Sequence, residues 1–342
     1  MRCRKGSPAA MLLLVTATVI LCLCLSCWAV GRTLEGLESG HWARSLRAPP
    51  LTVPESEHEA FRIAFCFYGL ARSTSYTLDS LNEHIFGPVR KTNGRIGYDT
   101  FVHTFVLNNY VVNDRAGETQ ASDYLAHKHD YRLLNATRQM VTSQEDFDKE
   151  MDDNANFYEF FSQRYWYREA SAKRNIYRAR HSLSMVWSVM ESYATEMKVH
   201  YDAVVLLRPD VMFLRDLDVV ERLPLPETTL FAPAFDTYRG VNDRFAYGDW
   251  AAMHAYTHRY ETMAPPRQPV KLYNTEQFLK LHLERLKVNV KQCDMLFSRV
   301  RMNGRIYDTK YLKYVCEEEG SVSACSAFKK VAEMPVDEES TG

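Results

Sequence analysis

The sequence predicts an α/β protein in which a mainly parallel sheet is flanked by helices and preceded by one transmembrane helix. Three observations support this prediction. Short, strongly apolar segments of strand length alternate with longer segments of helical periodicity, which is typical of a parallel sheet covered by helices. An uninterrupted apolar run of membrane-spanning length lies near the N-terminus. The segment between the run and the first strand has neither pattern.

The apolar run covers residues 11–30. About 20 helical residues at roughly 1.5 Å each match a hydrocarbon core of about 30 Å. Three basic residues precede the run, so residues 1–10 are expected to be a cytoplasmic tail and the rest of the chain luminal. A cleaved signal peptide is the alternative, because Ala29 places a small residue near a potential cleavage point. The run is longer than the roughly 7 to 15 apolar residues of a signal-peptide core, which favours an anchor.

The remaining segments complete a single-pass type II arrangement in the Golgi or endoplasmic reticulum membrane. Residues 31–59 are rich in Gly, Ser, Pro and charge, which predicts a flexible stem. Residues 60–330 are expected to form one luminal domain, and residues 331–342 a disordered acidic tail. In a luminal domain Asn135, in Asn-Ala-Thr, is a glycosylation candidate. A formal net charge of −1 argues against a protein that coats nucleic acid.

Four cysteines lie beyond the anchor, and three pairings are possible if all four form disulfides. Cys316 with Cys325 is the favoured pair, because it closes a short loop near the C-terminus. Cys66 lies in a very apolar segment, where a buried free thiol is an equally good interpretation.

Strands are predicted at Phe61–Tyr68, Tyr98–Leu107 and Tyr201–Phe213, and helices at Thr77–Val89 and Ala172–Met197. In sheets of this kind ligands bind beyond the carboxyl ends of the strands. Candidate functional residues are therefore sought directly after the strands.

The third strand is interrupted by Arg208-Pro209-Asp210, an ionisable pair that is costly to bury unless it has a role. The segment VVLLRPDVMFLRDLD at 204–218 resembles the strand end of GT-A glycosyltransferases, especially glycogenin-like enzymes, where an Asp-x-Asp motif stands. The resemblance implies a nucleotide-diphospho-sugar transferase fold. It also implies a divalent cation, Mn²⁺ or Mg²⁺, that holds the donor diphosphate.

In this comparison Asp210 matches the second aspartate, which makes it a candidate metal ligand and catalytic residue. Arg208 stands in place of the first aspartate. A guanidinium can itself bind a diphosphate through paired hydrogen bonds, so metal dependence stays open. An ordinary ion pair at a strand end is the alternative.

The loop after the first strand contains three candidate nucleotide contacts. Gly69 allows close backbone approach, and Arg72 and Ser73 at a helix start are suited to phosphate. Arg72 fits a solvated surface residue equally well.

Two carboxylates complete the candidate site. Asp243 lies in VNDRFAYG, which resembles a stretch of less characterised glycosyltransferase-like proteins that share the Arg-x-Asp strand end. It is a candidate for binding sugar hydroxyls or acting as a base, the alternative being a polar turn before a helix capped by Asp249. Glu276 follows the helix caps Asn274 and Thr275. Resemblance to a glycogenin-like Asp-Gln-Asp stretch implies a sugar contact there, and helix-terminal stabilisation alone explains it equally well.

The function expected from this resemblance is transfer of a sugar from a nucleotide-sugar donor to a hydroxyl of a luminal glycan, protein or lipid. Two alternatives stay open. A non-catalytic glycan-binding or scaffold protein can keep the same fold without activity. A sulfotransferase shares the type II topology and has a serine-containing phosphate loop similar to residues 72–75, but it leaves Arg208, Asp210 and Asp243 without a role.

Overall fold

The computed structural model describes residues 60–107, 127–153, 170–260, 274–307, 309–320 and 322–332. The predicted cytoplasmic tail, anchor and stem, and tail residues 333–342, lie outside the described residues. Within those ranges no helix is both long and apolar enough to cross a membrane.

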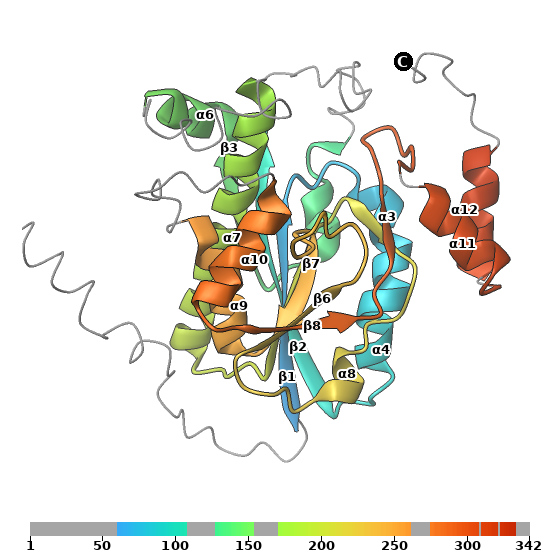
Figure 1. Ribbon diagram of the computed structural model, residues 1–342, viewed down its shortest axis with the longest axis horizontal. Coiled ribbons are helices and arrows are strands. Elements are labelled where there is room, and N and C mark those ends of the chain that lie inside the picture. Colours follow the sequence, from blue (N-terminus) through green and yellow to red (C-terminus); the bar gives the residue numbers. More distant parts are fainter. Residues whose placement is uncertain are drawn as a thin grey trace, which may run out of the picture. The chain divides into compact units, whose positions relative to one another are not determined.

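The core of the protein is a seven-stranded mixed sheet with the strand order β3-β2-β1-β4-β7-β6-β8 (Figure 1). Its strands, in chain order, are β1 (Phe61–Gly69), β2 (Ile96–Val106), β3 (Arg138–Ser143), β4 (Ala203–Leu207), β6 (Thr229–Pro233), β7 (Phe245–Gly248) and β8 (Asn289–Cys293). Strands β3, β2, β1 and β4 are parallel to one another, and β8 is parallel to β6. Strand β7 runs antiparallel to both of its neighbours. The sheet is therefore mainly parallel, as predicted.

The first two predicted strands are confirmed as β1 and β2, but the third is wrong as a single element. Strand β4 ends at Leu207, and the chain leaves the main sheet at Pro209, which has no N–H to donate to a ladder. Strand β5 (Val211–Phe213) then pairs antiparallel with β9 (Phe297–Arg299) in a separate two-stranded sheet. This departure turns the Arg-Pro-Asp segment away from the main sheet at the end of β4, while Val211 and Phe213 stay in the hydrophobic core.

The helical elements are α3 (Thr74–Ser80), η1 (Leu81–Phe86), α4 (Gly87–Arg90), η3 (Asp130–Leu134), α6 (Gln144–Asp153), α7 (Ala170–Met197), α8 (Val219–Arg222), α9 (Trp250–Thr257), η6 (His258–Tyr260), α10 (Thr275–Arg285), α11 (Thr309–Glu317) and α12 (Val322–Ala332). The predicted helix at 77–89 corresponds to the run α3-η1-α4, and the predicted helix at 172–197 to α7. Helix α12 continues two residues past the predicted domain end at residue 330, so the predicted tail begins too early.

Alternate side chains of β1 enter two different cores, because successive strand residues point to opposite faces. Phe65 and Phe67 pack with Leu81 and Ile85 of η1. On the opposite face the residues next to them in β1 pack with α7, α9 and α10, through Trp187, Met253 and Leu279 among others. Figure 1 shows α7, α9 and α10 on one side of the sheet and α3 and α4 on the other. Burial on both faces explains why β1 is apolar throughout.

The cysteine predictions are confirmed. Cys316 and Cys325 form a disulfide that joins α11 to α12. Cys66 and Cys293 are buried free thiols, and burial raises the pKa of the Cys66 thiol.

Candidate functional site

The turn after β4 holds an ion pair between the partly buried guanidinium of Arg208 and the buried carboxylate of Asp210. Arg208 Nε donates to Asp210 Oδ1 at 2.7 Å, and Arg208 Nη2 donates to Asp210 Oδ2 at 2.5 Å. The backbone of the turn is fixed from two sides, because Pro209 O accepts from Thr77 Oγ1 at 2.7 Å and Asp210 O accepts from Val300 N–H at 2.9 Å. The strand-end pair is thus held between α3 and the segment after β9.

The surroundings of Asp210 carry more positive than negative charge. The Asp210 side chain is 4% exposed, and Arg72 Nη2 lies 3.9 Å from Oδ2. Burial raises the pKa of this carboxyl, but Arg208, Arg72 and Arg301 together hold it below its ordinary value. Burial lowers the pKa of Arg208, and the Asp210 carboxylate more than offsets this. One carboxylate therefore faces three guanidinium groups, an arrangement suited to an anion.

The same geometry does not fit a divalent cation. Both oxygens of Asp210 accept hydrogen bonds from Arg208, so a cation would have to compete with this guanidinium for the same carboxylate. The described ranges hold no group of three or more His, Cys, Asp or Glu side chains that could bind a metal ion. The predicted role of Asp210 as a metal ligand is therefore not supported by the donor set.

The first loop contributes Arg72 to this cluster, but Gly69 and Ser73 are engaged elsewhere. Gly69 has φ +98° and donates its N–H to Ser182 Oγ at 2.7 Å. Ser73 is fully buried, and its hydroxyl donates to Val300 O at 3.0 Å. These two predicted phosphate contacts instead fix the loop that carries Arg72.

A second polar cluster is formed by the segment before β7 and the first turn of α10. Thr275 Oγ1 lies 2.9 Å from Asp243 Oδ2 and 3.1 Å from Glu276 Oε2. The backbone of Asp243 is fixed by Tyr68 of β1, whose hydroxyl donates to Asp243 O at 2.6 Å. Asp243 and Glu276, 33 residues apart in the sequence, are thus brought to one place.

Gly240 explains how closely the two segments approach. Val241 N–H donates to Glu276 O at 3.1 Å. A Cβ atom at Gly240 would lie 2.0 Å from the backbone carbon of Glu276, far inside van der Waals contact. Only glycine allows this backbone to rest on the first turn of α10.

The two carboxyl groups of this second cluster have opposite pKa shifts. Burial, and then the Asp243 carboxylate, raise the pKa of Glu276 to about 7. Burial also raises the pKa of Asp243, but Arg244, Arg259 and Arg208 outweigh it and the net pKa is lowered. Neighbouring groups with separated pKa values are suited to act as a hydrogen-bond donor and a hydrogen-bond acceptor.

Helix capping is carried out by other residues. Asn274 accepts the N–H of Gln277 at 2.8 Å, which caps α10. Asp249 accepts the N–H of Ala252 at 3.3 Å and is the N-cap of α9, as predicted. Thr275 and Glu276 are therefore not needed as caps, which favours a role for both in the cluster.

Sequence reasoning missed the role of several arginines. The Arg244 side chain is 13% exposed and lies 3.9 Å from Glu276 Oε1 and 4.0 Å from Asp236 Oδ2. Its Nη1 is buried and has no hydrogen-bond partner among the residues that the structure describes. Arg259 and Arg301 act on Asp243 and Asp210 from distant parts of the chain. A local motif cannot reveal Arg259 and Arg301, because only the fold brings them to the strand ends.

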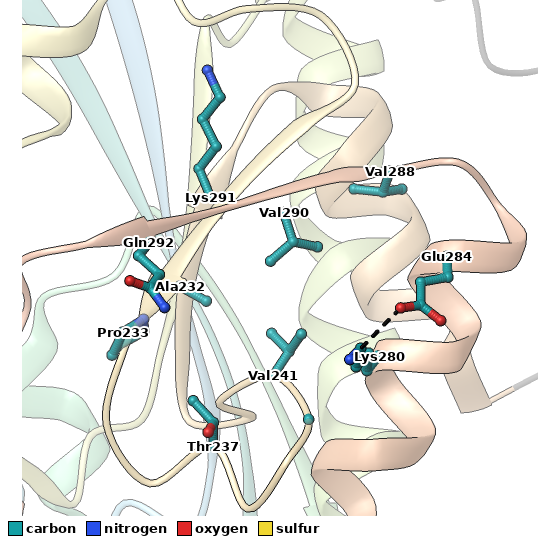
Figure 2. Close-up of a pocket in the computed structure, with 11 residues that line it drawn as sticks. Ala232, Pro233, Thr237, Val241, Lys280, Glu284, Val288, Val290, Lys291 and Gln292 are labelled. Atoms are coloured by element: carbon teal, nitrogen blue, oxygen red, sulfur yellow. Dashed lines mark ion pairs between the residues drawn. The ribbon is translucent and has the colours of Figure 1, made fainter.

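A pocket of about 360 Å³ lies beside this site but does not contain it. It is bounded by β8, β6, α10 and the segment that includes Gly240. Figure 2 shows Val241 and Val290 in its apolar part and the Lys280–Glu284 ion pair on α10 at one side. None of the seven predicted site residues lines the pocket, so the site is located by its charged groups rather than by this cavity.

No protein-family model matches the sequence, and no curated protein does. Among solved structures the chain is similar to the apo-form glycosyltransferase GlyE of Streptococcus pneumoniae TIGR4, with 13% identity and a TM-score of 0.29 over 80% of this chain and 51% of GlyE. It thus spans about half the length of GlyE. Mouse xyloside xylosyltransferase 1 is 9% identical, with a TM-score of 0.32 over 69% of this chain and 85% of that one. The galactosyltransferase LgtC is 12% identical, with a TM-score of 0.29 over 68% and 73% of the two chains. Such TM-scores reflect a coarse likeness, so function is inferred from the side chains of the site.

Proposed function

We propose that this protein transfers a sugar from a nucleotide-diphosphate donor to a hydroxyl group. The observation that carries the proposal is the placement of two charged clusters side by side, because Leu207 at the end of β4 is in register with Phe245 at the start of β7. Arg208 lies between them, and its guanidinium lowers the pKa of both Asp210 and Asp243. The first cluster has surplus positive charge, and the second offers a carboxylate beside a carboxyl with a raised pKa. The guanidinium groups of the first cluster suit a diphosphate, and the carboxyl groups of the second suit the binding and deprotonation of hydroxyl groups.

In the proposed reaction the bond between the anomeric carbon and the diphosphate oxygen breaks, and the acceptor oxygen forms a new bond to that carbon. Arg72 and Arg208 stabilise the negative charge that develops on the departing diphosphate. Asp243 accepts the proton of the attacking hydroxyl. No step is assigned to a divalent cation, because the donor set around Asp210 does not fit one.

The cellular setting is proposed from the sequence. Residues 11–30 would anchor the chain as a single-pass type II protein in the Golgi or endoplasmic reticulum membrane, with the described domain in the lumen. Two features agree with a position in the lumen of the secretory pathway. They are the Cys316–Cys325 disulfide and the exposed position of Asn135 in its sequon.

The proposal is tested by thermal stabilisation of the purified full chain with nucleotide sugars, free glycans and the sulfotransferase cofactor, each with EDTA or Mn²⁺. A ligand that binds only the folded state stabilises it by about 2.7 kcal/mol at a hundredfold excess over its Kd. We expect stabilisation by a nucleotide sugar in EDTA, lost in Arg208→Ala and kept in Arg222→Ala, a matched change of an arginine that is 40% exposed.

Each other result has a defined meaning. Stabilisation by free glycans alone would indicate a glycan-binding protein. Stabilisation by the sulfotransferase cofactor alone would indicate sulfate transfer. A nucleotide sugar that binds but is neither transferred nor hydrolysed would indicate a scaffold of the same fold.

A further inference from the structure

The hydroxyl of Thr275 lies within hydrogen-bond distance of two carboxyl groups. Its oxygen is 2.9 Å from Asp243 Oδ2 and 3.1 Å from Glu276 Oε2. A hydroxyl has one hydrogen and two acceptor lone pairs. Thr275 can therefore donate to only one of the two carboxyl oxygens.

The other contact is favourable only if its carboxyl group carries a proton. Two ionised carboxylates sharing one hydroxyl would leave a carboxylate oxygen facing a lone pair inside a buried site, which is costly. Glu276 is the better holder of the proton, because its side chain is 7% exposed and the cation with which it pairs, Arg244 Nη2, is 3.9 Å away, beyond hydrogen-bond distance. One hydrogen-bond pattern satisfies all three groups. The protonated Glu276 carboxyl donates to Thr275 Oγ1, and the Thr275 hydroxyl donates to Asp243 Oδ2.

Charged and titratable groups face Thr275, Asp243 and Glu276 from every neighbouring element. The segment before β7 supplies Asp243 and Arg244, and the segment after β6 supplies Asp236. The remaining facing groups are Tyr68 of β1, Arg208 after β4, Tyr256 of α9 and Arg259 of η6. Burial raises the pKa of both Tyr68 and Tyr256, so both tyrosines are neutral.

Among the described groups, the formal charges of this cluster then balance. With Arg208 paired to Asp210, the cluster contains the cations Arg244 and Arg259 and the anions Asp236 and Asp243. A neutral Glu276 adds no formal charge to the cluster. Among the described groups, three guanidinium groups act on the single carboxylate of Asp210, whereas the Thr275 cluster has no such excess of cations.

Resting on the proposed function, we propose that Thr275 is a positioning residue that holds a proton on Glu276, and that the resulting Asp243/Glu276 acceptor and donor pair selects an uncharged, hydroxyl-bearing sugar. The free oxygens fit this role. Within the described part of the chain, no side chain donates a hydrogen bond to Asp243 Oδ1 or Glu276 Oε1, so each can meet a ligand hydroxyl, although the Glu276 backbone N–H also contacts its own carboxyl group. A carboxylate-bearing sugar would bring an unbalanced charge next to Asp243.

The proton is tested first, in the full chain without ligand, by infrared titration of the protonated carboxyl band. We expect a band that is present at pH 6, disappears as pH rises through about 7 and is missing in Glu276→Gln. Thr275→Ser should keep the midpoint, and Thr275→Val should lower it by at least about half a pH unit, because the acceptor of the Glu276 proton is lost. A midpoint unchanged in Thr275→Val, or no band at pH 6 that Glu276→Gln removes, would overturn the proposal.

Ligand selection is tested with two matched pairs of probes whose sugars differ in charge, UDP-glucose with UDP-glucuronate and GDP-mannose with GDP-mannuronate. In whichever nucleotide series binds, we expect the uncharged sugar donor to bind at least tenfold more tightly than its carboxylate-bearing counterpart at pH 6. Its affinity should fall about tenfold by pH 8.5 in the wild type and stay flat in Glu276→Gln, whose amide still donates. Equal affinity within a pair, or a flat wild-type profile, would overturn the selection of an uncharged sugar.

The two proposals fail in different ways. If the carboxyl titration appears as expected but no nucleotide sugar of any class binds, the proposed function and the sugar role fail together while the proton on Glu276 stands. If a nucleotide sugar binds and the titration is absent, the proposed function stands and the inference about Glu276 fails.

Discussion

Glu276 should make the stability of the protein depend on pH near neutrality. Its folded pKa of about 7 lies above its ordinary value of 4.5, so its favourable contribution is complete below about 4.5 and is lost as pH rises through 7. The difference between the two pKa values corresponds to at most about 3 kcal/mol of unfolding free energy. Glu276→Gln should remove this slope. Urea unfolding at pH 5 and pH 8 measures it, and parallel profiles for both proteins would contradict the raised pKa.

Arg208 and Asp210 should be strongly coupled in stability. Asp210→Ala leaves a largely buried guanidinium without its carboxylate, a loss that costs about 3 kcal/mol. The double variant with Arg208→Ala should cost less than the two single changes together, by about 1 to 3 kcal/mol. The exposed pair Lys313–Glu317 on α11 serves as the control, with an expected coupling of about 0.3 to 0.5 kcal/mol. Equal coupling energies in the two cycles would contradict a buried pair.

The roles of residues at the strand ends could be predicted from the sequence only in part. Arg208 and Asp210 interrupt an apolar strand, and such an interruption is visible without a structure. Gly69 and Ser73 have the composition of a phosphate loop, but their partners in α7 and after β9 lie more than 100 residues away. The sequence contains no local signal of those partners, so the role predicted for these two residues could not be checked before the fold was known.

The segment before β7 and helix α10 should separate when Gly240 is replaced. In Gly240→Ala the new Cβ would lie 2.0 Å from the Glu276 backbone, so one segment must move. We expect the Glu276 titration to shift and ligand affinity to fall at least tenfold. Gly87→Ala is the control, since its Cβ would lie 3.2 Å from Asn82 O within one helical run and away from the site. Unchanged binding in Gly240→Ala would show that this contact does not position the carboxyl pair.

At the scale of elements, long periodic segments were predictable and short ones were not. Helix α7 shows its apolar spacing over 28 residues, and β1 is apolar throughout. Strand β8 reads Asn-Val-Lys-Gln-Cys, with its first four residues exposed at the edge of the sheet, so no apolar pattern indicates it. Strands β5 and β9 have three residues each and exist only because they pair with each other. Whether such short segments form strands depends on pairing partners that are distant in the sequence.

For the whole molecule, the C-terminal helices are connected to the candidate site by packing against the segment after β9 and by a hydrogen bond from α11. Leu312 of α11 packs in one cluster with Val300 and Ile306. Val300 N–H donates to Asp210 O at 2.9 Å. Tyr311 donates to Asp236 Oδ1 at 2.8 Å, and Asp236 faces Arg244. Both charged clusters therefore depend on where α11 lies.

Loss of the Cys316–Cys325 disulfide should loosen α11 and α12 and weaken ligand binding while the main sheet stays folded. Closing a loop of about ten residues stabilises the folded state by about 3 kcal/mol in the chain-entropy model. We expect hydrogen exchange to rise in α11, α12 and residues 300–306 after reduction, and the affinity for the stabilising nucleotide sugar to fall several-fold. Cys66, at 0% exposure between the sheet and α7, should stay unlabelled by iodoacetamide.

The variant Cys316→Ser/Cys325→Ser controls for effects of the reductant, because it should already show the loosened helices and should not respond to dithiothreitol. Rapid labelling of Cys66 on reduction would mean that the disulfide supports the whole fold and not the C-terminal helices alone. Unchanged exchange at residues 300–306 together with reduced affinity would place the connection in the Tyr311–Asp236 hydrogen bond, and Tyr311→Phe should then reproduce the loss.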